Sequence, residues 1–137
     1  MIPERYASVT YALFRIVFGY VFFIFGLQKL FGVFGGDQAQ LMSLQGAAGV
    51  VETVGGFLVM IGLLTKLAAF ISSGEMAFAY FINHNPRGFF PIQNGGERAA
   101  LFCFFFLFLW TAGPGTWSVD RWLRREKRRP ATAGHVI

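Results

Sequence analysis

The chain has few of the residues that soluble enzymes rely on, since only 14% of its 137 residues are charged and it has one cysteine and two histidines. So few charges cannot cover the exterior of a water-soluble domain of this size. The single cysteine, Cys103, excludes an internal disulfide and a Cys-x-x-Cys redox motif. Because it lies in an aromatic-rich run, we expect its thiol to be buried and inert. The composition therefore indicates one domain that is not water-soluble.

Hydrophobic residues make up 55% of the chain, and they form long runs rather than amphipathic stripes. A run of about 20 apolar residues is long enough to cross the hydrocarbon core of a bilayer as a helix. The runs predict an all-α fold, a membrane four-helix bundle that forms one domain over residues 1–116. The four transmembrane helices are predicted at about residues 8–34, 47–65, 67–83 and 95–112.

Polar or helix-breaking segments separate the predicted helices. Arg15 interrupts the first apolar run and no small-x-small cleavage site follows, so we interpret this run as a retained helix and not as a signal peptide. The connection at Thr65 and Lys66 is short enough to make an antiparallel hairpin of the second and third helices. The sequence Gly113-Pro114-Gly115 ends the fourth helix, which is short for a span.

The positive charge is concentrated at the C-terminal end. Six basic residues and Glu126 within residues 121–129 contribute +5, so the rest of the chain sums to zero. With Trp117 and Trp122, residues 117–129 predict a basic amphipathic helix at the membrane interface, followed by a disordered tail at 130–137. Basic residues favour the cytoplasmic side, so four spans place both termini in the cytoplasm. We expect the lipid bilayer as a partner and no nucleic-acid binding, because no folded basic surface is visible.

Charged and small residues share one face in each of the first two predicted helices, at helical spacings of three and four. Glycines on such a face let a neighbouring helix approach closely. The two faces consist of Arg15, Gly19, Phe22, Gly26 and Lys29, and of Glu52, Gly55, Val59, Gly62 and Lys66.

Charges inside a membrane are costly and are usually paired. Counting residues from the predicted helix ends places Arg15 and Glu75 at one depth, and Lys29 and Glu52 at another. We therefore predict two ion pairs, Arg15 with Glu75 and Lys29 with Glu52. Either these pairs only hold the bundle together, or they form a polar core that handles protons or a ligand.

Two further polar residues lie near the ends of the third and fourth helices. Glu97 forms a capping box with Asn94 or is catalytic, and the capping box is the better-supported reading. His84 lies near Glu52 and Glu97 in predicted height, but the spacing resembles no metal-ligand motif, so no metal is predicted. The candidate polar core is Arg15, Lys29, Glu52, Glu75, His84 and Glu97, with Glu75, Arg15 and His84 as the catalytic candidates.

An aromatic run follows Glu97. It would suit lipid contact, packing or an apolar cofactor such as a quinone, of which lipid contact is the most common use. A bis-histidine haem is not supported, because His135 lies in the tail and His84 has no second membrane histidine. The run consists of Phe102, Phe104, Phe105, Phe106, Phe108 and Trp110.

In this order, several short motifs together resemble the DoxX family of membrane proteins across roughly residues 8–122. The resemblance is carried by Arg15 with Gly19, GLQKL at 26–30, ETVGG at 52–56, GLLTK at 62–66, GEMAFAYF at 74–81, His84, Phe90-Pro91, NGGE at 94–97 and GPGTWSVD at 113–120.

The resemblance implies a multi-pass protein of the bacterial inner membrane. It further implies a membrane subunit of a respiratory or sulfur/thiol oxidoreductase, of the thiosulfate or thiol:quinone type, with a quinone as the candidate cofactor. Because a cysteine pair is absent, thiol or sulfur chemistry would need a partner subunit or a bound quinone. The alternatives are a non-catalytic accessory subunit of a membrane complex and, less favoured, a small-solute or proton conduit.

Overall fold

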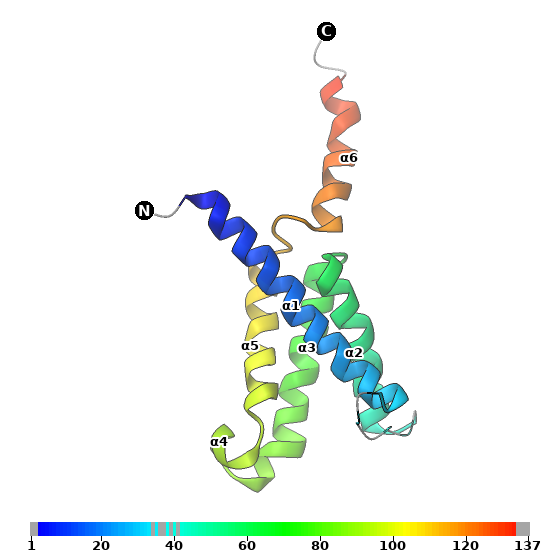
Figure 1. Cartoon of the computed structure of the whole chain (residues 1–137), viewed down its shortest axis with the longest axis vertical. Helices are drawn as coiled ribbons and strands as arrows, with labels where there is room; N and C mark the ends of the chain where they lie inside the picture. Colours follow the sequence, from blue (N-terminus) through cyan, green and yellow to red (C-terminus); the bar gives the residue numbers. More distant parts are fainter. Residues whose placement is uncertain (1–2, 34, 36–37, 39, 41, 134–137) are drawn as a thin grey trace.

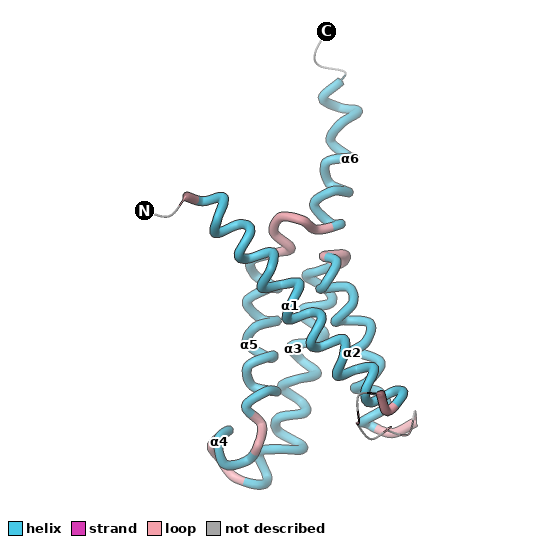
Figure 2. The backbone as a smooth tube through the Cα atoms, in the orientation of Figure 1, coloured by secondary structure: helices cyan, strands magenta, loops and turns pink. Residues whose placement is uncertain are grey.

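The computed structural model describes residues 3–33, 35, 38, 40 and 42–133, and within these residues the chain is helical and has no strand (Figures 1 and 2). The all-α prediction is confirmed for this part of the chain. The α-helices are α1 (Glu4–Phe31), α2 (Leu44–Ile61), α3 (Thr65–Ala79), α4 (Pro91–Asn94), α5 (Glu97–Ala112) and α6 (Val119–Ala133). A π-helical turn, η1 (Tyr80–His84), and a 3-10 turn, η2 (Asn85–Arg87), follow α3 directly.

Helices α1 and α2 pack closely against each other, because glycines remove side chains from their contact. A Cβ atom added at Gly26 would lie 2.3 Å from the backbone nitrogen of Thr53, and one at Gly56 would lie 2.4 Å from that of Phe23. The predicted glycine face of α1 is therefore confirmed. Close backbone approach is the usual way in which helices associate in a membrane.

Helix α5 packs its phenylalanines against α1 and α3. Phe22 of α1 lies 4.6 Å from Phe106 between ring centroids, and Phe18 stacks on Phe105 at 4.4 Å. Ser73 of α3 donates a hydrogen bond to the carbonyl oxygen of Cys103 at 2.9 Å. The aromatic run thus forms much of the protein core, although Phe104 and Phe108 still face outward. Cys103 is half-buried beside this core.

The helix boundaries differ from the predicted ones by a few residues. Gly32 and Gly62 end α1 and α2, since both adopt a left-handed backbone that stops a helix. Helix α2 begins earlier than predicted because Ser43 caps it, accepting a hydrogen bond from the backbone nitrogen of Gly46. Among the described residues, α1 and α2 are long and apolar enough to cross a membrane. Helices α3 and α5 have 15 and 16 residues, so four spans remain a prediction.

Helix α6 leaves the bundle at the end where α1 begins, and α4 lies at the opposite end (Figure 1). Asp120 fixes its first turn, because its two carboxylate oxygens accept hydrogen bonds from the backbone nitrogens of Leu64 and Thr65, both at 2.9 Å. The helix continues past Pro130 to Ala133, beyond the predicted end at residue 129. The rest of the predicted tail, with His135, lies outside the described residues.

Candidate functional site

Arg15 is fully buried, but it does not pair with Glu75, so this predicted ion pair is wrong. The guanidinium group donates hydrogen bonds to four backbone carbonyl oxygens: Val59 at 3.1 Å, Thr116 at 2.9 Å, Trp117 at 2.8 Å, and Pro114. Counting residues from the predicted helix ends missed this arrangement, because the count considered only the helices and not the loop after α5, which contacts α1 through Arg15. An arginine with five donors suits such a cluster of carbonyls. We call this arrangement the Arg15 clasp.

The second predicted ion pair is confirmed. Lys29 of α1 lies 2.6 Å from Oε1 of Glu52 on α2, and Glu52 is only 2% exposed. The other carboxylate oxygen, Oε2 of Glu52, is buried and has no hydrogen-bond partner. A buried carboxylate oxygen is costly to leave unsatisfied, so this atom marks a place for an additional donor.

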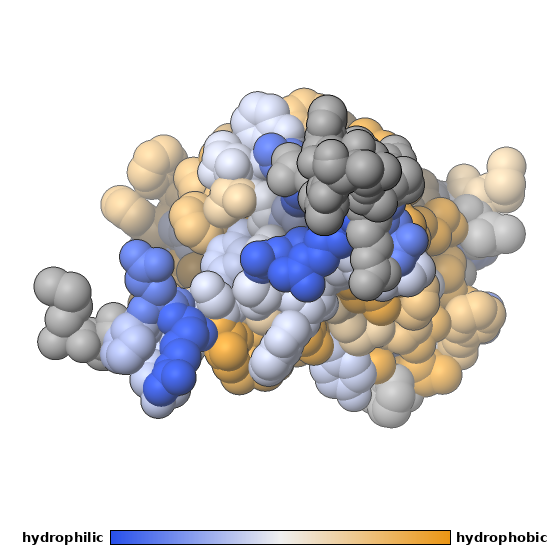
Figure 3. All heavy atoms as spheres, turned by 90° about the horizontal axis from the view of Figure 1, so that it is seen from above, coloured by the Kyte–Doolittle hydropathy of each residue, from blue (hydrophilic) through white to orange (hydrophobic). Residues whose placement is uncertain are grey.

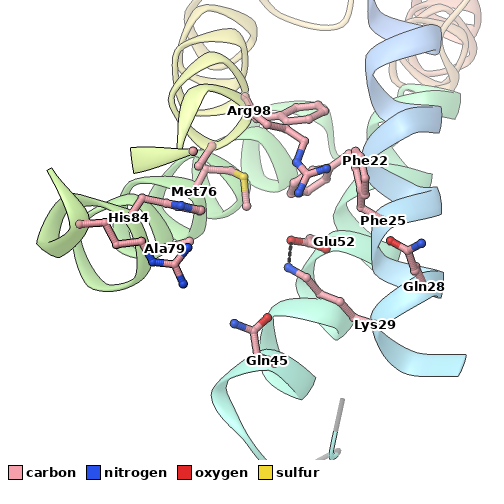
Figure 4. Close-up of a pocket in the computed structure, with 14 residues that line it drawn as sticks. Phe22, Phe25, Gln28, Lys29, Gln45, Glu52, Met76, Ala79, His84 and Arg98 are labelled. Atoms are coloured by element: carbon pink, nitrogen blue, oxygen red, sulfur yellow. Dashed lines mark hydrogen bonds and ion pairs between the residues drawn. The ribbon is translucent and has the colours of Figure 1, made fainter. Parts of the chain in front are cut away.

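A cavity of about 330 Å³ adjoins this pair between α1, α2, α3 and α5 (Figure 4). Its volume lies at the lower end of the range of small-molecule sites, which starts at about 300 Å³. The lining combines aromatic and aliphatic side chains with several polar ones. It is made by Phe22, Phe25, Gln28, Lys29, Gln45, Glu52, Met76, Ala79, His84, Arg87, Gly95, Arg98, Ala99 and Phe102.

Arg98 is the most informative lining residue that the sequence reasoning missed. Its guanidinium carbon lies 4.0 Å from the ring centroid of Phe25, which is close enough for a cation–π interaction. The available signal was its spacing of four from Phe102, which places both on one face of α5. Gln28, Gln45 and Arg87 were also missed, because polar residues near helix ends have no distinctive spacing.

Glu75 lies in a second, smaller cavity of about 150 Å³, which it shares with Lys29 and the apolar side chains of Phe78 and Ile82. Its Oε2 atom is buried and lacks a hydrogen-bond partner. Lys29 and Gln45 line both cavities, so the cavity with Glu75 adjoins the cavity with Glu52.

His84 and Glu97 have different surroundings. His84 lies on the π-turn η1 and lines the larger cavity, as Figure 4 shows. Glu97 is exposed and is the first residue of α5, whose N-cap is Gly96, so the predicted capping box with Asn94 is wrong. Within the described residues, no three His, Cys, Asp or Glu side chains come together to hold a metal ion.

Of the six candidate polar-core residues, the structure brings Lys29, Glu52 and His84 to the larger cavity and Glu75 to the adjoining one. The cavity offers flat aromatic surfaces, cationic donors and one unsatisfied carboxylate oxygen. Such a set can hold a planar, mostly apolar ring that carries oxygen atoms at its edge: the rings stack, the cations donate to carbonyl oxygens, and the carboxylate accepts from a hydroxyl group.

The chain is similar to a known protein family and to two bacterial proteins. The DoxX family model matches residues 10–85. An uncharacterized protein of Haemophilus influenzae is 40% identical over 124 residues, covering 85% of this chain and 92% of the relative. An uncharacterized membrane protein of Mycobacterium tuberculosis is 33% identical over 135 residues, covering 85% of this chain and 82% of the relative. No solved structure matches the chain.

Proposed function

This chain belongs to the DoxX family of membrane proteins, and we propose that it is a membrane subunit of an oxidoreductase that binds a quinone head group in the cavity beside Glu52. The observation that carries this proposal concerns Glu52, which lines the cavity and whose buried Oε2 atom has no hydrogen-bond partner. A quinol hydroxyl group is a donor that such an atom can accept.

The remaining lining residues fit the two forms of the same ligand. Phe25 and Phe102 line the cavity with aromatic side chains that would contact a six-membered ring. Lys29 and Arg98 supply cationic donors for a quinone carbonyl oxygen, while Glu52 accepts from the quinol hydroxyl. The bound ring would supply two-electron redox chemistry, and the residues of this chain would orient the ring and exchange its protons.

The electrons require a second protein, because the chain carries one cysteine and no pair of thiols. A partner subunit that oxidises two thiols to a disulfide, or two thiosulfate ions to tetrathionate, releases two electrons. These two electrons and two protons convert a quinone to a quinol. In this proposal, Lys29, and Glu52 once it is protonated, would pass these protons to the ring oxygens.

The proposed setting is the bacterial inner membrane with four spans and both termini in the cytoplasm. The common end of α1 and α6 in Figure 1, with the basic helix α6 at that end, supports this orientation. A conduit is less well supported, because Phe22 and Phe106 fill the bundle centre with buried aromatic rings.

A non-catalytic accessory subunit is the second candidate. It is favoured by the Arg15 clasp and by the Lys29–Glu52 pair, since both connect separate helices and could serve only to hold the bundle together. In that case the cavity would have no ligand, and the unsatisfied oxygen of Glu52 would be a cost without a function.

Purification from native membranes in mild detergent, with mass spectrometry of bound proteins and lipids, separates the two candidates. We expect a redox-active partner together with quinone, and we expect Glu52→Gln to lose most of the quinone while retaining the partner. Glu97→Gln is the matched control, because Glu97 is exposed and does not line the cavity. Recovery of the wild-type protein with a complete enzyme but without quinone would support the accessory role instead.

A further inference from the structure

A surface depression of about 420 Å³ lies at the end of the bundle where α6 begins. It shares no lining residue with the cavity beside Glu52. Four cationic side chains surround it, and no carboxylate lines it. Residues 113–115 of the loop after α5 form part of its lining. The lining consists of Lys66, Ala112, Gly113, Pro114, Gly115, Arg121, Arg124 and Arg125.

The backbone around this depression is held in place by hydrogen bonds. Asp120 holds the first turn of α6 against the start of α3 through both carboxylate oxygens, and its own backbone nitrogen donates to the carbonyl oxygen of Gly62 at 2.9 Å. The Arg15 clasp holds the loop through the carbonyl oxygens of Thr116 and Trp117. The backbone that carries the arginines at the start of α6 is therefore held beside Lys66, which would not be so in an unattached basic tail.

No carboxylate among the lining residues compensates the clustered positive charge. The carboxylate of Asp120 is already used by the backbone nitrogens of Leu64 and Thr65. Lys66 lies in the first turn of α3, where the helix dipole disfavours a cation. Four cations around one depression also repel each other. An anion bound among them would relieve both costs.

The surroundings indicate that the anion belongs to a membrane lipid. Trp117 and Trp122 are about 60% exposed, at 61% and 59%, and line a neighbouring depression together with Arg121 and Arg125. Exposed tryptophans beside arginines are typical of the boundary between headgroups and acyl chains. Seen from this end, one group of hydrophilic residues lies near the middle with apolar residues on several sides of it, and a second hydrophilic group lies at one edge (Figure 3).

We propose that the depression formed by Lys66, Arg121, Arg124 and Arg125 binds the phosphodiester headgroup of an anionic phospholipid. The guanidinium groups donate paired hydrogen bonds to the phosphate oxygens, and the ammonium group of Lys66 contributes a point charge. The two indoles anchor the lipid at the interface. This site does not depend on the quinone cavity, so either proposal can fail without the other.

Native mass spectrometry of the full-length protein with added phosphatidylglycerol or phosphatidylcholine tests the proposal. We expect phosphatidylglycerol to be retained more tightly, and we expect Arg124→Gln and Lys66→Gln each to weaken its binding about fivefold, as for removal of one surface charge at an anionic membrane. Both residues are exposed, so the variants should fold, and size-exclusion chromatography checks this.

Arg5→Gln is the matched control, because it removes one charge from an exposed arginine that lies outside the depression. Equal retention of the two lipids, or an equal loss in Arg5→Gln, would overturn the proposal. Inorganic phosphate and a short oligoglutamate peptide are added as competitors at equal concentration. Displacement of phosphatidylglycerol by the phosphate would assign the site to a free anion, and displacement by the peptide would assign it to an acidic protein. Either outcome rejects a lipid site.

Discussion

Replacing Arg15 with methionine should destabilise the bundle strongly, because four backbone carbonyl oxygens lose their donor at once. These are the carbonyls of Val59, Pro114, Thr116 and Trp117, which belong to α2 and to the loop after α5. Each hydrogen bond to a charged group contributes about 1.5–3 kcal/mol, but such contributions are not additive. Breaking a buried charged network costs about 3–5 kcal/mol, and we expect a loss within this range. Arg15→Lys keeps the charge without the planar fork, so we expect about half that loss.

The free energy of unfolding can be measured by adding sodium dodecyl sulfate to the protein in mild micelles and following tryptophan fluorescence. The carbonyl oxygen of Trp117 accepts from Arg15, so one reporter lies at the clasp itself. Arg5→Met is the control on the same helix, since Arg5 is exposed and should change stability by less than about 0.5 kcal/mol. A loss below about 1 kcal/mol in Arg15→Met would refute the assignment of Arg15 as the main link between the loop and the bundle.

The same unfolding assay checks three further predictions. Gly26→Ala should cost about 1–3 kcal/mol of unfolding free energy, because the added Cβ would meet the backbone of α2. Gly74→Ala is the control, because a Cβ there meets nothing within 4 Å, and it should be neutral or slightly stabilising. Equal effects of the two substitutions would contradict the close contact. Lys29→Met should cost about 3–5 kcal/mol by leaving the Glu52 carboxylate buried and unpaired, and an unchanged stability would argue that Glu52 is already neutral. Asp120→Ala should cost about 1 kcal/mol through loss of the cap on α3 and should increase proteolysis at the start of α6; unchanged cleavage would contradict its anchoring role.

The sequence predicts the parts of the site that depend on helical spacing. Glycines at positions 19 and 26 share a face with Lys29, and that face packs on α2 as expected. Counting residues from the predicted helix ends gives the Lys29–Glu52 pair, although in the structure Lys29 lies in the last turn of α1 and Glu52 near the middle of α2. In such cases a spacing of three or four residues translates directly into a shared contact.

Other parts of the site depend on backbone positions that leave no pattern in the sequence. Carbonyl oxygens of the loop accept the hydrogen bonds of Arg15, although they lie about a hundred residues away in the sequence. Because every residue type has a backbone carbonyl oxygen, the sequence does not mark these acceptors. Asn94 is the last residue of the extra short helix α4 and Gly96 is the N-cap of α5, so the three-residue spacing of Asn94 and Glu97 does not make a capping box. The π-turn after α3 places His84 at the cavity, and a periodicity argument assumes a regular helix there.

The central claim is that the cavity beside Glu52 binds a quinone ring, and photo-crosslinking of the protein in nanodiscs tests it most directly. An azido-quinone is illuminated with the protein, and the labelled peptides are identified by mass spectrometry. We predict labelling of peptides that contain Phe25 and Phe102, competition by unlabelled quinone, and strong reduction in Glu52→Gln but not in Glu97→Gln. Labelling confined to lipid-facing residues such as Phe104, unaffected by Glu52→Gln, would contradict the account.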